Sequence, residues 1–260
     1  MKLRPLLLLL AAFVLTVIAL AFWRAHLPPV GGPPPRPPPP LVLSFAQTTP
    51  AAKVELTIDP AIARYPALTQ RLYRDGVGDL KGFAAQAADD QARLTAKGLP
   101  ARPYQRSIVW SLTAATARIV SVKQAWFDDT GGAHPNHGAK GLLWNETAGR
   151  EIARDELLRA GADPAQLDQL LCQAIRAEKT HRQGTVFDLR TWPCPRWADA
   201  DFVLAPSNVP GKAGGLVFLF DPYSIGPYVE GDWAIVVPQA EFRAELAPVW
   251  AGEFAGAPAG

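Results

Sequence analysis

The spacing of hydrophobic residues predicts a mixed domain of strands and helices that begins near residue 53. Apolar and polar residues alternate over residues 54–58, which is typical of a half-buried strand. The dipeptide Asp59-Pro60 is a favourable helix start, because Asp accepts hydrogen bonds at an N-cap and proline suits the first helical position. We expect a helix, or a pair of helices broken near Pro66, to run to about Thr95.

Two further strands are predicted around residues 104–112 and 120–126. The link between them is short, so an antiparallel hairpin is the simplest connection. The second strand leads into the sequence TGGAHPNH at residues 130–137, which we take as a loop. A short strand at residues 142–144 follows, and then a turn at residues 145–150.

The C-terminal half of the chain alternates between helical and strand patterns. We expect a short helix at 155–160, a longer one from Asp163-Pro164, strands at 202–204, 216–220 and 233–237, and a short last helix at 241–247. Because the hairpin links are too short for parallel crossovers, the sequence predicts an α+β domain with a mainly antiparallel sheet packed by a few helices.

The N-terminal segment predicts export. Residues 5–23 are uncharged, Lys2 and Arg4 precede them, and Arg24 follows. As a helix this run is about 28 Å long, which is close to the hydrocarbon thickness of a bilayer. We therefore expect a signal anchor at residues 1–24, with a single-pass topology in the inner membrane and the domain in the periplasm. A cleaved signal peptide stays open, because residues 19–21 have the small-x-small form of a cleavage site, and the domain would then be secreted.

A proline-rich linker is predicted at residues 25–52. Residues 28–40 contain nine prolines and two glycines, which favours a stiff polyproline II spacer of roughly 40 Å. We expect residues 41–52 to be a further connector, the domain to span residues 53–254, and residues 255–260 to be a tail.

The charge balance excludes one class of partner, and the motifs exclude several kinds of chemistry. After residue 40 the chain carries 22 basic and 24 acidic residues, so no basic domain is present to bind nucleic acid. The sequence contains no GxSxG motif and no phosphate-binding loop, and we predict no cofactor.

The chain has two cysteines, Cys172 and Cys194. Thiols in exported domains tend to pair, and a disulfide closing this loop would stabilise the fold by roughly 3 kcal/mol. We expect the disulfide; the alternative is two separate thiols, with Cys172 buried on its helix. Too few Cys and His residues lie close together to supply four zinc ligands.

The TGGAHPNH stretch holds the candidate chemistry. His134 and His137, with Asp128 or Asp129, are the ligand types of an open metal site, and this makes a metal-dependent envelope hydrolase the alternative function. A structural interpretation is that the glycines allow an unusual backbone that local hydrogen bonds hold. A third interpretation is a loop that contacts a ligand.

Aromatic residues near the last strands are the other candidates. Tyr223, Tyr228 and Trp233 can line a groove that stacks on sugars, although aromatic residues near strands are more often part of the core. The predicted ligand-binding residues are Thr130, Gly131, Gly132, His134, Asn136, Tyr223 and Tyr228. No catalytic residue is assigned.

Four stretches together resemble one family, the exported domain shared by RsiV-type anti-sigma factors and by the non-catalytic part of PdaC-type deacetylases. They are RYPAL at 64–68, SVKQAWFDDTGGAHPN at 121–136, the strand, turn and helix at 142–159, and residues 218–238 with DPYSIGPYVEG and IVVP. The resemblance implies an α+β domain on a membrane anchor.

The resemblance also implies a partner. RsiV-type proteins bind lysozyme through the outer domain and a sigma factor through a cytoplasmic segment. Only about four residues precede the apolar run here, and no deacetylase domain follows, so we expect neither of those roles. We expect an outward-facing binding domain whose ligand is a cell-wall glycan or an envelope protein such as lysozyme.

Overall fold

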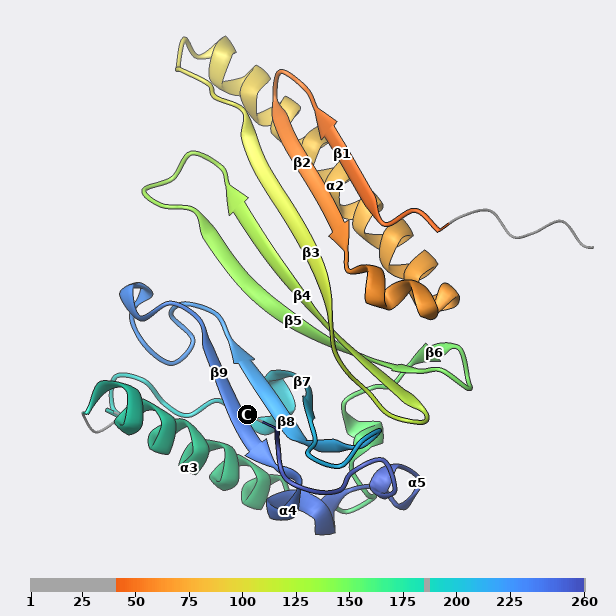
Figure 1. Ribbon diagram of the computed structural model, residues 1–260. Coiled ribbons are helices and arrows are strands. Elements are labelled where there is room, and N and C mark those ends of the chain that lie inside the picture. The colour runs from red at the N-terminus through yellow and green to blue at the C-terminus, as the bar shows by residue number, and fades with distance from the viewer. Residues whose placement is uncertain (1–40, 185–187, 260) are drawn as a thin grey trace, which may run out of the picture. The chain divides into compact units, whose positions relative to one another are not determined.

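The computed structural model describes residues 41–184 and 188–259 (Figure 1). The predicted signal anchor at residues 1–24 and residues 25–40 of the predicted linker lie outside the described residues. Within the described ranges, no helix is both long and apolar enough to cross a membrane. These described residues form one compact unit of the α+β class, with two sheets and a few helices.

The first sheet has six strands in sequence order, and all neighbouring pairs but one are antiparallel. The exception is the parallel pair β2 and β3, because a long helix, α2, connects them as a crossover. Its elements are β1 (Ser44–Thr48), β2 (Ala52–Ile58), the 3-10 helix η1 (Pro60–Arg64), α2 (Pro66–Ala96), β3 (Tyr104–Ala115), β4 (Ile119–Asp129), β5 (Asn136–Asn145) and β6 (Arg150–Glu151).

Helix α2 covers one face of this sheet, and the first hydrophobic core lies between them. Every second residue of β2 is buried, which is the alternation that the sequence predicted. Gly76 brings the helix close to β2, because a methyl group there would lie 3.0 Å from a methyl carbon of Leu56. As predicted, Asp59 accepts a hydrogen bond from the N–H of Ala61 at the helix start.

The folded unit begins earlier than the expected boundary at residue 53. Residues 41–52 were expected to be a connector, but Ser44–Thr48 form β1, which pairs antiparallel with β2. The strand forms because Leu43 and Phe45 pack against the first core, and this contact is not visible in so short a pattern. The expected tail is also part of the fold, since the N–H of Ala259 donates to the carbonyl oxygen of Pro206.

The expected loop at residues 130–137 is shorter, because β5 begins at Asn136 instead of residue 142. Its first half pairs with β4 along the full register, from Asn136 opposite Asp128 onward. Gly138, Lys140 and Gly141 interrupt the apolar pattern, so the strand is defined by its pairing with β4 and not by its own hydrophobicity.

The second sheet has three antiparallel strands in the order β7-β8-β9, and helix α3 packs against β9 (Figure 1). Asp163 caps α3 as predicted, by accepting hydrogen bonds from the N–H groups of Ala165 and Gln166. The elements are η2 (Asp155–Leu157), α3 (Pro164–Gln183), η3 (Trp197–Asp199), β7 (Asp201–Pro206), β8 (Ala213–Phe220), η4 (Tyr228–Glu230), β9 (Trp233–Pro238), α4 (Gln239–Phe242), η5 (Arg243–Glu245) and α5 (Pro248–Ala251).

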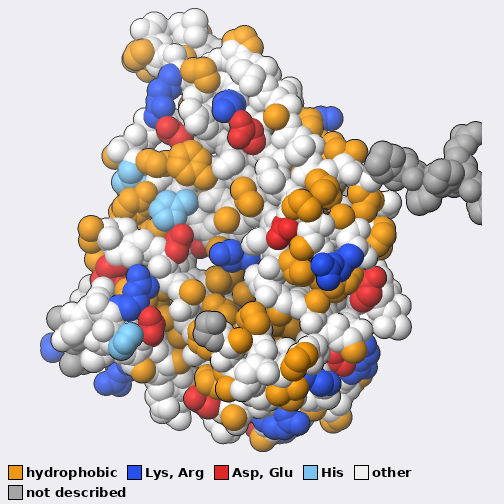
Figure 2. Space-filling view, viewed as in Figure 1, with side chains coloured by type: hydrophobic (Ala, Val, Ile, Leu, Met, Phe, Trp, Pro, Cys, Tyr) orange, Lys and Arg blue, Asp and Glu red, His pale blue; other side chains and the backbone are white. Residues whose placement is uncertain are grey.

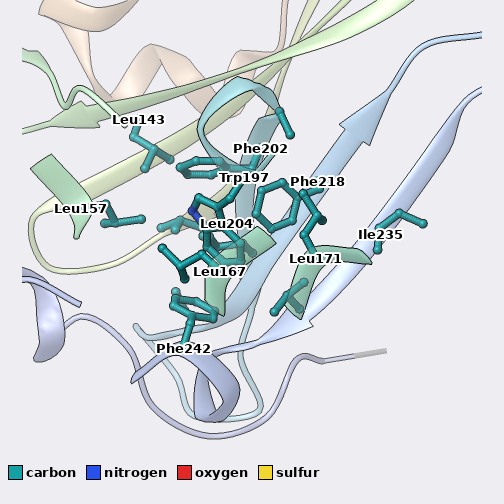
Figure 3. Close-up of a cluster of buried hydrophobic side chains, with 14 of the residues drawn as sticks. Leu143, Leu157, Leu167, Leu171, Trp197, Phe202, Leu204, Phe218, Ile235 and Phe242 are labelled. Carbon is teal, nitrogen blue, oxygen red and sulfur yellow. The ribbon is translucent and has the colours of Figure 1, made fainter. Parts of the chain in front are cut away.

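The second core lies between this sheet, α3 and the end of the first sheet, and it is rich in aromatic residues (Figure 3). The ring of Trp197 meets Phe218 edge to face, with 4.6 Å between ring centroids. The predicted disulfide is confirmed: Cys172 of α3 is bonded to Cys194, 22 residues later, and it joins the helix to the segment that delivers Trp197.

The two sheets meet where β5 passes β7. Gly141 makes this approach possible, because a methyl group there would overlap the carbonyl oxygen of Phe202. The N–H of Leu204 donates to the hydroxyl of Ser121, which is fully buried. This junction places the segment after β8 beside the exposed edge of β5, and so it determines where the candidate site forms.

Candidate functional site

The loop between β4 and β5 is held at its base by one carboxylate. Asp129 accepts a hydrogen bond from the N–H of Gly131 at 3.0 Å, and Arg102 donates to both of its oxygens at 2.7 and 3.0 Å. The Gly131 hydrogen bond and the Arg102 pair lower the pKa of Asp129, so the carboxylate stays charged. Gly131 has a φ of +88°, a conformation that side chains with a Cβ rarely adopt.

This loop meets the segment 221–232 in what we call the aromatic cluster, consisting of His134, His137, Tyr223 and Tyr228. The ring of His134 lies over that of Tyr228, with 4.0 Å between centroids and 30° between planes. His137 approaches Tyr228 edge-on at 5.7 Å, and the ring of Tyr223 lies 5.7 Å from that of Tyr228 and 6.4 Å from that of His134. The Tyr228 hydroxyl donates to the carbonyl oxygen of Pro135 at 2.9 Å.

A buried lysine of α3 holds the 221–232 segment through hydrogen bonds. Lys179 of α3 is 3% exposed, and its Nζ donates to the carbonyl oxygen of Ile225 and to Glu230, each at 2.6 Å. The ammonium also lies 4.6 Å from the centroid of the Trp233 ring. Burial acts to raise the pKa of Glu230, but the hydrogen bonds from Lys179 and Gln183 and the Lys179 charge outweigh it, so the pKa is lowered.

The outer side of the aromatic cluster is exposed. Tyr223 is 55% exposed and has a φ of +70°, and Val229 is 89% exposed. On the face drawn in Figure 2, histidine side chains lie beside hydrophobic side chains toward the left. Exposed aromatic and aliphatic side chains held on a fixed backbone are typical of a contact surface.

Asp221 joins this segment to the edge of β5. Its carboxylate accepts a hydrogen bond from the N–H of Ala139 at 2.7 Å, and Gly138 leaves the space that the carboxylate fills. Burial raises the pKa of Asp221, and the nearby charges of Asp232 and Asp201 add to the shift, although the Ala139 hydrogen bond opposes it.

The structure brings three predicted ligand-binding residues together and places the others nearby. His134, Tyr223 and Tyr228 belong to the aromatic cluster. Thr130, Gly131 and Gly132 are exposed in the loop, and Asn136 is exposed at the start of β5. Trp233, the third aromatic candidate, is 3% exposed and belongs to the second core.

The residues of the hypothetical metal site do not converge. Asp128 makes a bidentate pair with Arg106, and His137 lies 3.1 Å from Asp232. The reason is strand geometry: in the β4–β5 register Asp128 is opposite Asn136, so His137 points to the other face of the sheet. Among the described residues, no group of three His, Cys, Asp or Glu side chains lies close enough to hold a metal ion.

Sequence reasoning missed Lys179 and Asp232. The burial of Lys179 could have been predicted, because it follows Leu171 and Ile175 at four-residue spacing and so belongs to the apolar face of α3. A lysine on a buried helix face predicts a carboxylate or carbonyl oxygen nearby that accepts its hydrogen bonds. Asp232 has no such signal, because its partner His137 lies on β5, far away in the sequence.

Comparison with known proteins finds a similarity to one family over the C-terminal part of the chain. The profile of a family described as "Protein of unknown function (DUF3298)" matches residues 155–240, which include the 221–232 segment but not the β4–β5 loop. No curated protein matches the sequence.

Two solved structures have a similar fold. A DUF3298 family protein from Pseudomonas aeruginosa PAO1 aligns with a TM-score of 0.57 and 16% identity, over 82% of this chain and 94% of that one. A member of the same family from Bacteroides fragilis NCTC 9343 aligns with a TM-score of 0.56 and 17% identity, over 81% of this chain and 94% of that one. At this level of identity, the likeness shows a shared fold over about four fifths of this chain.

Proposed function

We propose that this chain is an extracytoplasmic binding domain, tethered to the inner membrane by residues 1–24, that recognises an envelope protein such as lysozyme through the aromatic cluster. The observation that carries the proposal is the contact between His134 and Tyr228, which joins two sequence stretches into one exposed surface. Those stretches are among the four that resemble RsiV-type outer domains.

The character of the surface favours a protein partner. Aromatic side chains are enriched at protein interfaces, where a few of them supply most of the binding energy. Tyr223 and Val229 are exposed, while Tyr228 is held by its hydrogen bond to Pro135. Side chains that are already fixed lose little conformational entropy on binding.

The support beneath the surface agrees with a binding role. Lys179 and Glu230 hold the 221–232 segment, and Asp129 holds the 130–135 loop, so contacts within the chain position both halves of the surface. The carboxylates that a metal-dependent hydrolase would need are already paired with Arg102 and Arg106. We therefore assign no reaction to this surface.

A binding assay with the full-length protein tests the proposal. Lysozyme and insoluble peptidoglycan are offered separately, and Val229→Ser and His134→Ala are compared with the parent. Val249→Ser is the matched control, because Val249 is also an exposed valine, at 54%, but it lies on α5. We expect lysozyme binding to weaken about tenfold in His134→Ala and in Val229→Ser, whose residue is the exposed neighbour of Tyr228, and to be unchanged in the control.

Two results would overturn the proposal. One is the absence of saturable lysozyme binding by the parent protein. The other is equal binding by the parent, Val229→Ser and His134→Ala. Binding to peptidoglycan alone, lost in the same variants, would assign the cluster to a glycan in place of a protein.

A further inference from the structure

A cleft of about 410 Å³ lies on the α2 side of the first sheet. Its volume falls in the range of about 300–1,000 Å³ that is usual for small-molecule sites. One wall is α2, the floor is β3, β4 and β5, and Asp221 closes the edge. The side chains that line it are Arg71, Leu72, Asp75, Asp79, Arg106, Ile108, Trp110, Gln124, Trp126, Asp128, Lys140, Leu142 and Asp221.

The floor follows from the strand register. Trp110, Gln124 and Lys140 are neighbours across β3, β4 and β5, so their side chains form one row on the same face. In the next row Trp126 is opposite Gly138, which has no side chain to cover the indole. The Asp221 carboxylate occupies the space above Gly138 and stands at that end of the row.

Most charged groups of the cleft neutralise one another. Arg106 pairs with Asp128 and Asp79, and Arg71 lies 3.5 Å from Asp75. Among the described residues, Lys140 and Asp221 are the charged lining groups for which no ion pair is found. The cleft therefore offers one ammonium, one carboxylate and the Gln124 amide as hydrogen-bonding groups beside an aromatic floor.

We propose that this cleft binds a pyranose ring of an oligosaccharide, with the apolar face of the sugar on Trp126 and its hydroxyls bonded to Lys140, Asp221 and Gln124. A sugar has an apolar ring face and many hydroxyls, and it matches an aromatic floor rimmed by separate donors and acceptors. Nucleotides and other strongly anionic ligands need clustered free cations, whereas both arginines here are paired. A lipid would need a wall without charges.

The cleft goes beyond the proposed function, because it lies on the opposite face of β5 from the aromatic cluster. His137 points toward Tyr228, whereas Lys140, three residues later on the same strand, lines the cleft, as the alternation of a strand requires. Sugar binding in the cleft and protein binding at the cluster can therefore succeed or fail separately.

Calorimetric titration of the full-length protein, in a detergent without a sugar headgroup, tests the inference. The probes are cellotetraose, maltotetraose and a β-1,4-linked tetramer of N-acetylglucosamine. The variants are Trp126→Phe, Lys140→Ala and Asp221→Asn. Lys123→Ala is the matched control, because Lys123 is on β4 but on the opposite face from Gln124 and Trp126.

We expect saturable binding of at least one tetramer, weakened about fivefold to tenfold by each cleft variant and unchanged in Lys123→Ala. His134→Ala should bind the same sugar as the parent does. Thermal denaturation of each variant shows whether the fold is retained, and Trp126→Phe keeps an aromatic ring on the floor. The inference is overturned if no tetramer binds at millimolar concentration, or if folded cleft variants bind as well as the parent.

Discussion

The ring of His134 lies over the ring of Tyr228, with 4.0 Å between the two centroids. His134 lies in the loop between β4 and β5 and Tyr228 lies in η4, and the hydroxyl of Tyr228 also donates to the carbonyl oxygen of Pro135. One tyrosine therefore both stacks on the β4–β5 loop and hydrogen-bonds to it. This contact joins the two halves of the candidate surface, and its strength is measurable.

Tyr228→Phe should lower the free energy of unfolding by about 0.5–1.5 kcal/mol, because it removes one hydrogen bond and keeps the ring. Urea denaturation measures the change, and amide hydrogen exchange at residues 131–134 should become faster. Tyr223→Phe is the control, since no hydrogen bond to the Tyr223 hydroxyl is found among the described residues. Equal stability of Tyr228→Phe and the parent would show that this bond does not hold the loop.

Gly141→Ala should destabilise the protein by about 1–3 kcal/mol, since its methyl group would overlap the Phe202 carbonyl oxygen and separate the sheets. Gly82→Ala in α2 has open space around it and should stabilise by about 0.5–1 kcal/mol, because alanine favours a helix. Thermal denaturation compares the two variants. A Gly141→Ala protein as stable as the parent would contradict the close approach of β5 and β7.

Replacing Cys172 and Cys194 together by serine should cost about 3 kcal/mol, as expected from the chain entropy of a loop of this length. The denaturation midpoint in urea measures the loss. The parent treated with a reducing agent is the control and should unfold at the same midpoint as the double variant. An unchanged midpoint after reduction would mean that the disulfide contributes nothing to stability.

Glu230→Gln should destabilise the protein by about 1–3 kcal/mol at pH 7, because Lys179 loses its charged acceptor. The pKa of Glu230 is lowered from 4.5, so its carboxylate stabilises the fold above that pH. This stabilisation is lost as the pH falls through the lowered pKa. The difference between parent and variant should therefore be full at pH 7 and shrink below about pH 4.5. A difference independent of pH would contradict the charge pair.

Asp221→Asn should stabilise the protein at pH 7, in contrast to Glu230→Gln. Burial raises the pKa of Asp221, so the charged form is unfavourable in the folded state, and the cost disappears as the pH falls and the carboxyl takes up a proton. Asparagine still accepts from the N–H of Ala139. We expect the variant to be more stable than the parent at pH 7 and equal to it at low pH. Denaturation at a series of pH values measures this, and greater stability of the parent at pH 7 would contradict it.

Most elements were predictable, because they depend on residues close in sequence. The alternation over residues 54–58 and the Asp-Pro starts at Asp59 and Asp163 predicted β2, η1 and α3 correctly. β1 and the first half of β5 were missed for a shared reason: both are strands because of the neighbours that they pair with. A short or glycine-rich segment does not show that pairing in its own pattern.

The sequence by itself determined the α+β class, the capped helices, the pair of cysteines and the two aromatic and histidine-rich stretches. These follow from local periodicity and from residue chemistry. Tertiary structure decided that His134 meets Tyr228, that Asp128 and His137 face apart, and that a cleft opens beside Trp126. The physical reason is that these relationships depend on strand register and on the contact at Gly141, which brings together segments that are distant in the chain.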